Sequence, residues 1–263
     1  MPVPIGVVFY PNAGSGARMG LVSDPPILWQ YAFSNFNEKV RWALDHKGVA
    51  HERRSLLPGS PRQIRFMAGG TLPVLELDGE RIMDSTAIIA VLEERFDGPS
   101  LYPSDPDPQG QALKLEDFFD EHAGHEVRRA FFWEARDDLG LLTKMLSTDQ
   151  SRWTRGFIRA GFPIGWQVMK RRYRFYEHDA AEAREAIRVA LDRIEAERNG
   201  RDHLVGDSFT VADLTAAALL YPLALPLPEF PYRLPEIPPT PNLDELRAHP
   251  AVGWIRDTWR RHR

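Results

Sequence analysis

The chain has 263 residues, of which 43% are hydrophobic and 27% are charged, and its formal net charge is −4. This composition is ordinary for a folded globular protein, and the small net charge gives no electrostatic reason to expect a nucleic-acid or membrane partner. Cysteine is absent, which excludes disulfides, thiolate metal sites and any mechanism that uses a thiol of the protein itself.

Residues 1–26 contain several glycines and prolines but no lasting helical or strand period, so we expect a flexible leader. No basic segment precedes the apolar run Ile5–Tyr10, which is too short for the core of a secretory signal. We therefore expect a cytoplasmic protein. Gly14-Ser15-Gly16 is not followed by the Gly-Lys-Ser/Thr of a phosphate-binding loop, so we expect no nucleotide site there.

Residues 27–57 indicate a strand, a helix and a second strand. The first strand is Ile27–Tyr31, and a helical pattern of apolar residues begins at Phe36. Gly48 stands where a glycine typically ends a helix. A second strand is predicted within Ala50–Leu57, and proline and glycine then break the chain before, at most, a short helix at Arg62–Met67.

A hairpin followed directly by a helix is predicted for residues 74–96. Val74–Leu77 and Glu80–Met83 are the two strands, and Asp78-Gly79 is a typical two-residue hairpin turn. Asp84 or Ser85 can begin the helix. Because a helix N-terminus attracts a carboxylate, this pair either only caps the helix or also binds a ligand.

The order of these elements, together with three motifs, resembles the thioredoxin-like domain of the glutathione transferase superfamily. The motifs are Ser34-Asn35-Phe36-Asn37-Glu38-Lys39-Val40-Arg41, Leu72-Pro73-Val74-Leu75 and Asp84-Ser85-Thr86. The resemblance implies an α/β domain with a four-stranded mixed sheet over residues 27–96, followed by an all-helical domain.

Residues 97–108 are rich in proline, aspartate and serine, so we expect a linker without helix or strand, and an all-helical domain over 109–263. Glycine and proline are expected to interrupt helix at Gly156–Gly165, and Pro222–Pro241 is expected to form an irregular excursion. Thr210 and Asp213 predict a capping box before a buried helix, which is similar to the central helix of the same family.

The resemblance implies a glutathione site. Ser34 would donate a hydrogen bond to the sulfur of the thiol, and the residues that hold the tripeptide would be Asn35, Thr71, Leu72, Pro73, Asp84 and Ser85, with a cis peptide bond at Leu72-Pro73. The alternative for Ser34 is a simple helix cap. Thr71 replaces the Lys or Gln of many members, so recognition of the glycyl end would fall to other residues such as Arg62, Gln63 or Arg65.

An electrophile pocket is expected opposite the thiol, because the helical half is rich in aromatic residues. Its candidate residues are Tyr31, Phe33, Phe132, Trp133 and Trp166. Packing in the core is the alternative for each ring. Arg171, Arg172 and Arg174 either bind an acidic substrate or form a solvated helix face. His122 and His125 lack the Glu-x-x-His repeats of a di-metal bundle, so we expect no metal.

We therefore expect a glutathione S-transferase that activates a glutathione-type thiolate for attack on an apolar electrophile, with no cofactor beyond this co-substrate. The resemblance also implies a homodimer. A non-catalytic dimeric scaffold with the same fold is the alternative. Disulfide reduction is excluded, because it would require a cysteine.

Overall fold

The computed structural model describes residues 8–9, 25–56, 71–235 and 240–263. The predictions for the short helix at Arg62–Met67 and for most of the leader lie outside these residues. None of the described helices combines the length and the apolar character that crossing a bilayer requires.

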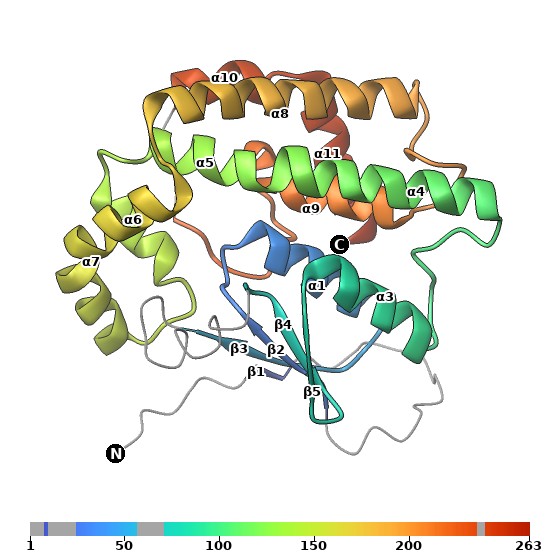
Figure 1. Ribbon diagram of the computed structural model, residues 1–263, viewed down its shortest axis with the longest axis horizontal. Helices are drawn as coiled ribbons and strands as arrows, with labels where there is room; N and C mark the ends of the chain where they lie inside the picture. Colours follow the sequence, from blue (N-terminus) through green and yellow to red (C-terminus); the bar gives the residue numbers. More distant parts are fainter. Residues whose placement is uncertain (1–7, 10–24, 57–70, 236–239) are drawn as a thin grey trace.

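In its described residues, the first domain is a mixed sheet covered on one face by two helices (Figure 1). The sheet has the order β1-β3-β2-β4-β5. Its strands are β1 (Val8–Phe9), β2 (Ile27–Gln30), β3 (Glu52–Ser55), β4 (Val74–Leu77) and β5 (Glu80–Met83), and the helices are α1 (Asn35–His46) and α3 (Ser85–Arg95). The predicted thioredoxin-like sheet of four strands is confirmed.

The fifth strand, β1, comes from the segment that was predicted to be a flexible leader. It pairs antiparallel with β3, with Val8 opposite Arg53 and Phe9 opposite Glu52. A strand of two residues is too short to show an alternating pattern of apolar and polar residues. It is recognised only by its pairing with the edge of β3. Val8 and Phe9 thus form a short strand that the sequence did not predict.

The local signals at the hairpin and helix ends are confirmed. Asp78 and Gly79 both have positive φ angles, 51° and 82°, which is the geometry of the tight turn between β4 and β5. Asp84 is the N-cap of α3. Gly48, with φ 70°, follows the C-cap of α1. These signals concern adjacent residues, so the sequence was sufficient to place them.

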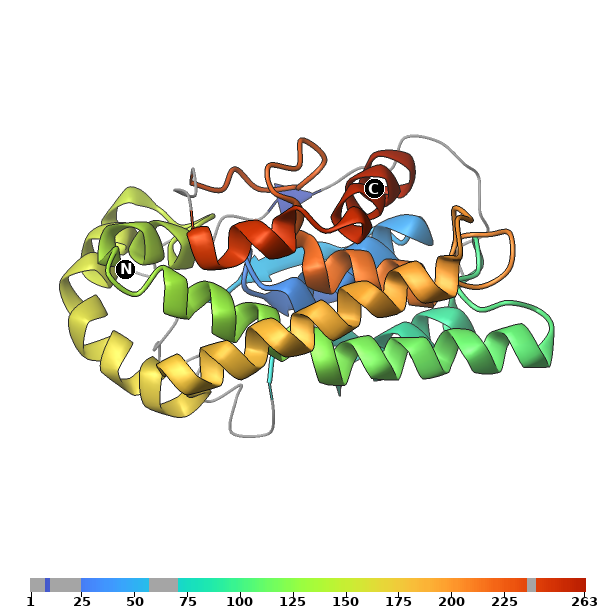
Figure 2. The ribbon, with the colours of Figure 1, turned by 90° about the horizontal axis from the view of Figure 1, so that it is seen from above.

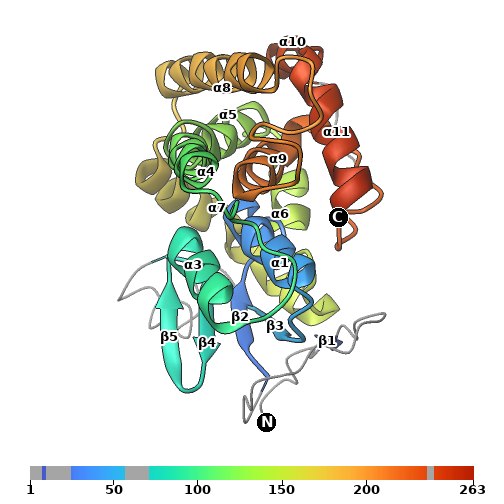
Figure 3. The same cartoon turned by 90° about the vertical axis from the view of Figure 1, so that its right-hand side faces the viewer.

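The second domain is helical and stacks on α1 and α3 (Figure 3). Its helices are α4 (Pro106–Phe119), the π-helical turn η1 (Asp120–Gly124), α5 (His125–Glu134), α6 (Leu139–Leu146), α7 (Arg152–Tyr173), α8 (Glu177–Arg198), α9 (Val211–Ala224), α10 (Pro241–Arg247) and α11 (Pro250–His262). Seen from above, α6 and α7 lie at one end of the molecule (Figure 2).

Helix α9 is the centre of the second domain, as predicted. All of its residues except Pro222 are buried, and it packs against α1, α4 and α11. The carboxylate of Asp213 accepts hydrogen bonds from the backbone N–H of Thr210 at 2.9 Å and of Leu204 at 2.8 Å. The capping aspartate thus also fixes the loop that precedes the helix.

Two predicted interruptions are wrong. Helix α4 begins at Pro106, inside the predicted linker, because proline is tolerated in the first turn of a helix, where its missing N–H has no partner to lose. Helix α7 runs without a break through Pro163 and the glycines of 156–165. Pro163 is exposed, so water can hydrate the carbonyl that loses its partner there.

Candidate functional site

A cavity of about 1310 Å³ lies between the two domains. One wall comes from the β2–α1 connection, the start of β4 and the start of α3, and the other from α5, α6, α7 and the end of α9. Its lining includes ten of the predicted residues, which are Tyr31, Phe33, Ser34, Asn35, Thr71, Leu72, Pro73, Asp84, Ser85 and Phe132. The fold therefore brings together three motifs that are up to about fifty residues apart.

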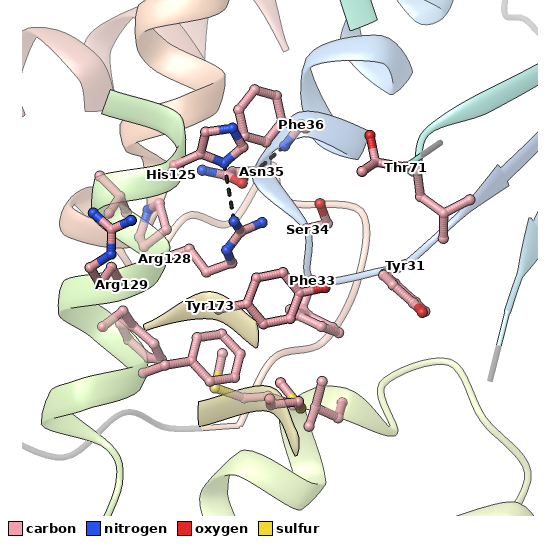
Figure 4. A pocket seen from close by; sticks show the side chains of 18 of the residues that line it. Tyr31, Phe33, Ser34, Asn35, Phe36, Thr71, His125, Arg128, Arg129 and Tyr173 are labelled. Carbon is pink, nitrogen blue, oxygen red and sulfur yellow. Dashed lines mark hydrogen bonds between the residues drawn. The ribbon is translucent and has the colours of Figure 1, made fainter. Parts of the chain in front are cut away.

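Ser34 is the N-cap residue of α1 and faces this cavity (Figure 4). Its backbone is extended, with φ −77° and ψ 130°, and its carbonyl accepts the hydrogen bond of the Glu38 N–H at 2.9 Å. Its side chain makes no capping hydrogen bond, so the interpretation of its hydroxyl as a simple cap is wrong. Among the described residues the hydroxyl has no partner, and it remains available to a ligand.

Asn35 has a structural role that the sequence did not indicate. Its amide nitrogen donates to the carbonyl of Gly124 at 2.9 Å and to that of Leu219 at 3.1 Å, and its oxygen accepts from the N–H of Phe36 at 3.0 Å. Both amide hydrogens are therefore engaged in joining α1 to the helical domain. Asn35 also lines the cavity, and its contact with glutathione stays a prediction.

Asp84 and Ser85 are at the N-terminus of α3, and both line the cavity. Oδ1 of Asp84 accepts from the N–H of Thr86 at 3.0 Å and of Ala87 at 3.1 Å. The backbone of Asp84 has φ 77°, a conformation that non-glycine residues rarely adopt and that is concentrated at functional sites. Asp84 is exposed, whereas Ser85 is buried and its hydroxyl has no partner in the described part of the chain.

The peptide bond between Leu72 and Pro73 is cis, as the resemblance implied. Pro73 is buried at the start of β4, and Leu72 is half-buried beside it on the cavity wall. Thr71, the residue before them, is exposed at the same wall. This loop therefore lines the same cavity as Ser34 and Ser85.

Aromatic rings line both walls of the cavity. The ring of Phe33 lies 6.3 Å from that of Phe132, and Tyr31 stacks on Phe33 at 5.9 Å. Trp133 and Trp166, however, do not line the cavity. Trp166 is only 7% exposed and packs in the core against Phe175, and Trp133 lies under the guanidinium of Arg136 at 4.0 Å. Core packing was the correct alternative for Trp166.

One face of α5 brings polar side chains to the cavity that were not among the predicted site residues. His125, Arg128 and Phe132 are spaced by three and four residues, so they share one face of the helix, and all three line the cavity. This spacing in the sequence could have indicated that the three side chains lie on one face of a helix. The guanidinium of Arg128 donates to Nδ1 of His125 at 3.1 Å and lies 4.6 Å from the centre of the Tyr173 ring (Figure 4).

The imidazole of His125 is neutral near pH 7. Burial lowers its pKa to about 4, and the charges of Arg128 and Arg129 act in the same direction. Because arginine can only donate, Nδ1 of His125 must be the acceptor and Nε2 carries the proton. The neutral ring therefore leaves the positive charge of Arg128 uncompensated.

The π-helical turn η1 precedes this face of α5. It ends at Gly124, whose position lies so close to Phe36 that an added Cβ would be 2.4 Å from the tip of the ring. Such turns insert one extra residue into a helix and commonly occur at functional sites. Here the turn is contacted by α1 through Phe36 and Asn35, and the first residue after it is His125.

Family models match both halves of the chain. Residues 28–100 match the model described as the N-terminal domain of glutathione S-transferase, and residues 157–248 match that of its C-terminal domain. Both halves of the predicted family assignment thus have a match.

The curated relatives share part of this sequence. A probable glutathione S-transferase of Nicotiana tabacum is 32% identical over 112 residues, which are 40% of this chain and 48% of the relative. A maleylacetoacetate isomerase of Rhizobium meliloti is 36% identical over 90 residues, 32% of this chain and 42% of the relative. The chain therefore spans about half the length of the curated relatives that it matches.

Solved structures show the same fold over most of the chain. A β-etherase from Sphingobium sp. superposes with a TM-score of 0.59 at 23% identity, covering 89% of this chain and 99% of the other. A glutathione S-transferase from Methylobacterium radiotolerans, solved in complex with glutathione sulfonate, gives a TM-score of 0.55 at 26% identity, covering 88% and 93%.

Proposed function

Because the chain belongs to the glutathione transferase superfamily, we propose that it binds glutathione in the cavity between its domains and directs the thiolate to an electrophilic carbon. One observation carries this proposal. The hydroxyls of Ser34 and Ser85, each beside the start of a helix, line one cavity, and neither has a hydrogen-bond partner among the described residues. The loop of Leu72 and Pro73 lines the same cavity.

The start of α3 would hold the γ-glutamyl end of glutathione. The first N–H groups of a helix have no partner within it and attract a carboxylate. Since Asp84 already accepts from Thr86 and Ala87, the N–H and hydroxyl of Ser85 remain for that carboxylate. Asp84 is exposed and lines the cavity, and its Oδ2, which accepts no hydrogen bond among the described residues, would accept from the γ-glutamyl ammonium.

Ser34 would stabilise the thiolate. A free thiol has a pKa of about 8.5, and a donated hydrogen bond together with a helix N-terminus favours the charged form. The Ser34 hydroxyl would donate to the sulfur without becoming covalently attached. The thiolate then forms a carbon–sulfur bond with the electrophile, and either a leaving group departs with its electron pair or a conjugated double bond takes up the electrons and then a proton from water.

Glutathione binding is the first test. Millimolar glutathione should raise the melting temperature, because a ligand present at about one hundred times its Kd stabilises a protein by roughly 2.7 kcal/mol. Ser85→Ala should weaken binding about 10-fold, as expected when a hydrogen bond to a charged group is lost. Unchanged melting at every glutathione concentration would instead favour the dimeric scaffold.

Ser34→Ala tests catalysis separately from binding. The variant should keep most of its glutathione affinity, while the pKa of the bound thiol, read from thiolate absorbance, rises toward its solution value and conjugation of 1-chloro-2,4-dinitrobenzene slows at neutral pH. A variant with full rate and unchanged thiol pKa would remove Ser34 from the mechanism. The proposal includes an apolar electrophile and a homodimer, and sedimentation equilibrium checks the latter.

A further inference from the structure

Arg128 contributes a positive charge to the cavity wall. Its guanidinium is half-buried and points into the cavity on the side where Ser34 lies (Figure 4). It contacts the neutral ring of His125 and the face of Tyr173. No carboxylate in the described part of the chain lies within ion-pair distance of it. A guanidinium has five N–H donors, and His125 occupies only one of them.

Among the described residues, two carboxylates line the cavity, and each already has a partner. Asp84 caps α3, and Glu126 forms an ion pair with Arg129. Neither lies within ion-pair distance of Arg128, although the charge of Glu126 partly opposes the lowering of the Arg128 pKa by burial. A half-buried charge without a partner costs free energy, and this cost is offset if the cavity receives an anion.

A second arginine reinforces the positive potential. Arg172 on α7 lies over the same Tyr173 ring, at 5.5 Å, and has no carboxylate partner among the described residues. Its neighbour Arg174, in contrast, is paired with Asp179 at 2.5 Å. The guanidinium groups of Arg128 on α5 and Arg172 on α7 thus both lie over the ring of Tyr173, and both helices belong to the second-domain wall of the cavity.

We propose that the second substrate is an apolar electrophile that carries one carboxylate, and that Arg128 binds this carboxylate. The inference rests on the proposed function, because it assigns the substrate class of the same cavity. The planar guanidinium matches a carboxylate in two parallel hydrogen bonds. The apolar body of the substrate would lie against Phe132, which is on the same face of α5.

The position of Arg128 separates this role from glutathione binding. The groups assigned to the thiol lie on the first domain, at Ser34, Pro73 and Ser85, whereas Arg128 comes from α5 of the second domain. An anion held by Arg128 would therefore place the electrophilic carbon between the two walls. The sulfur at Ser34 would then approach it from the first domain.

A matched pair of aryl chlorides tests the proposal. In 4-chloro-3-nitrobenzoate the thiolate attacks the carbon that bears chlorine, a carbon–sulfur bond forms, the carbon–chlorine bond breaks, and chloride leaves with its electron pair. Its methyl ester undergoes the same reaction but has no charge. Binding of both is first measured by calorimetry without glutathione, so that no reaction takes place.

The variant is Arg128→Met, and the matched control is Arg136→Met. Arg136 also lies over an aromatic ring, that of Trp133, but it does not line the cavity. We expect the wild-type protein and the Arg136 control to bind the carboxylate more tightly than the ester. Arg128→Met should weaken binding of the carboxylate by about 10- to 100-fold and leave the ester unchanged.

Three results would overturn the proposal. The first is equal affinity of the wild-type protein for carboxylate and ester, or no binding of either. The second is an Arg128→Met variant that retains the preference seen in the control. The third is a loss shared by both aryl chlorides, together with weaker glutathione binding or a raised thiol pKa, which would assign Arg128 to the thiol.

The same experiment separates this proposal from the proposed function. If glutathione does not stabilise the wild-type protein, the transferase proposal fails, while the carboxylate preference still reports on Arg128. If glutathione binds and the neutral ester is conjugated but no carboxylate preference depends on Arg128, only the substrate assignment fails. Melting temperatures of both variants verify that they are folded.

Discussion

The ammonium nitrogen of Lys39 lies 2.8 Å from Oε1 of Glu116, and neither side chain is exposed. Lys39 belongs to α1 of the first domain and Glu116 to α4 of the second, so this ion pair crosses the domain boundary. Burial is the main cause that raises the pKa of Glu116, and the charge of Lys39 opposes it. The two domains are therefore coupled by charges that water does not screen.

Lys39→Met should destabilise the protein strongly, since it leaves a buried carboxylate without its counter-ion. The expected loss in the free energy of unfolding is about 3–5 kcal/mol, measured by urea denaturation. The control is Arg95→Met, which breaks the exposed pair between Arg95 and Glu80 and should cost about 0–1 kcal/mol. Equal effects of the two substitutions would contradict the importance of the buried pair.

Asp213→Ala should destabilise the second domain. The substitution removes the acceptor of two backbone N–H groups, of Leu204 and Thr210, and of the Thr210 hydroxyl, all of them buried. We expect a loss of about 2–4 kcal/mol in the free energy of unfolding. Asp207→Ala, at an exposed position of the same loop, is the control and should change stability by less than about 0.5 kcal/mol.

His51 should make stability depend on pH. Its Nδ1–H donates to the carbonyl of Val49 at 2.7 Å, and its Nε2 accepts from Arg53 at 2.9 Å, so the folded protein holds the ring neutral. Burial is the main cause that lowers its pKa to about 4. The unfolded chain takes up this proton near pH 6.5, so stability is full above that pH and falls as the pH decreases toward 4.

The size of this effect can be measured with one variant. A pKa shift of this magnitude in a buried group corresponds to about 3 kcal/mol of the free energy of unfolding. His51→Asn should remove that part of the decline between pH 6.5 and 4, as followed by urea denaturation at several pH values. His125→Asn should remove a separate part, because the pKa of His125 is also lowered to about 4. If the free energy of unfolding of His51→Asn declined with pH as steeply as that of the wild-type protein, His51 would not be a source of the pH dependence.

Gly124→Ala should disturb the junction between α1 and η1. The added methyl group would lie 2.4 Å from the Phe36 ring, which must move, and Phe36 lines the cavity. We expect a loss of about 1–3 kcal/mol and a change in ligand affinity. Gly156→Ala on α7 meets no atom within 4 Å and should instead stabilise the helix by about 0.5–1 kcal/mol. Similar effects at both positions would argue against the contact with Phe36.

Local signals in the sequence were sufficient for most of the elements. The Asp78-Gly79 turn, the cap at Asp84 and the interaction of Thr210 with Asp213 lie where they were predicted, because each depends on residues a few positions apart. The three motifs also identified the family, and with it the residues that meet at the cavity.

The tertiary structure decided what depends on distant partners. The sequence did not indicate that the amide of Asn35 donates to the carbonyls of Gly124 and Leu219. It also predicted a break in α7, whereas the helix continues through Pro163. The uncompensated charge of Arg128 is likewise a property of its surroundings. Periodicity and caps are encoded within a few residues, whereas hydrogen-bond partners and counter-ions are supplied by packing between segments far apart in the chain.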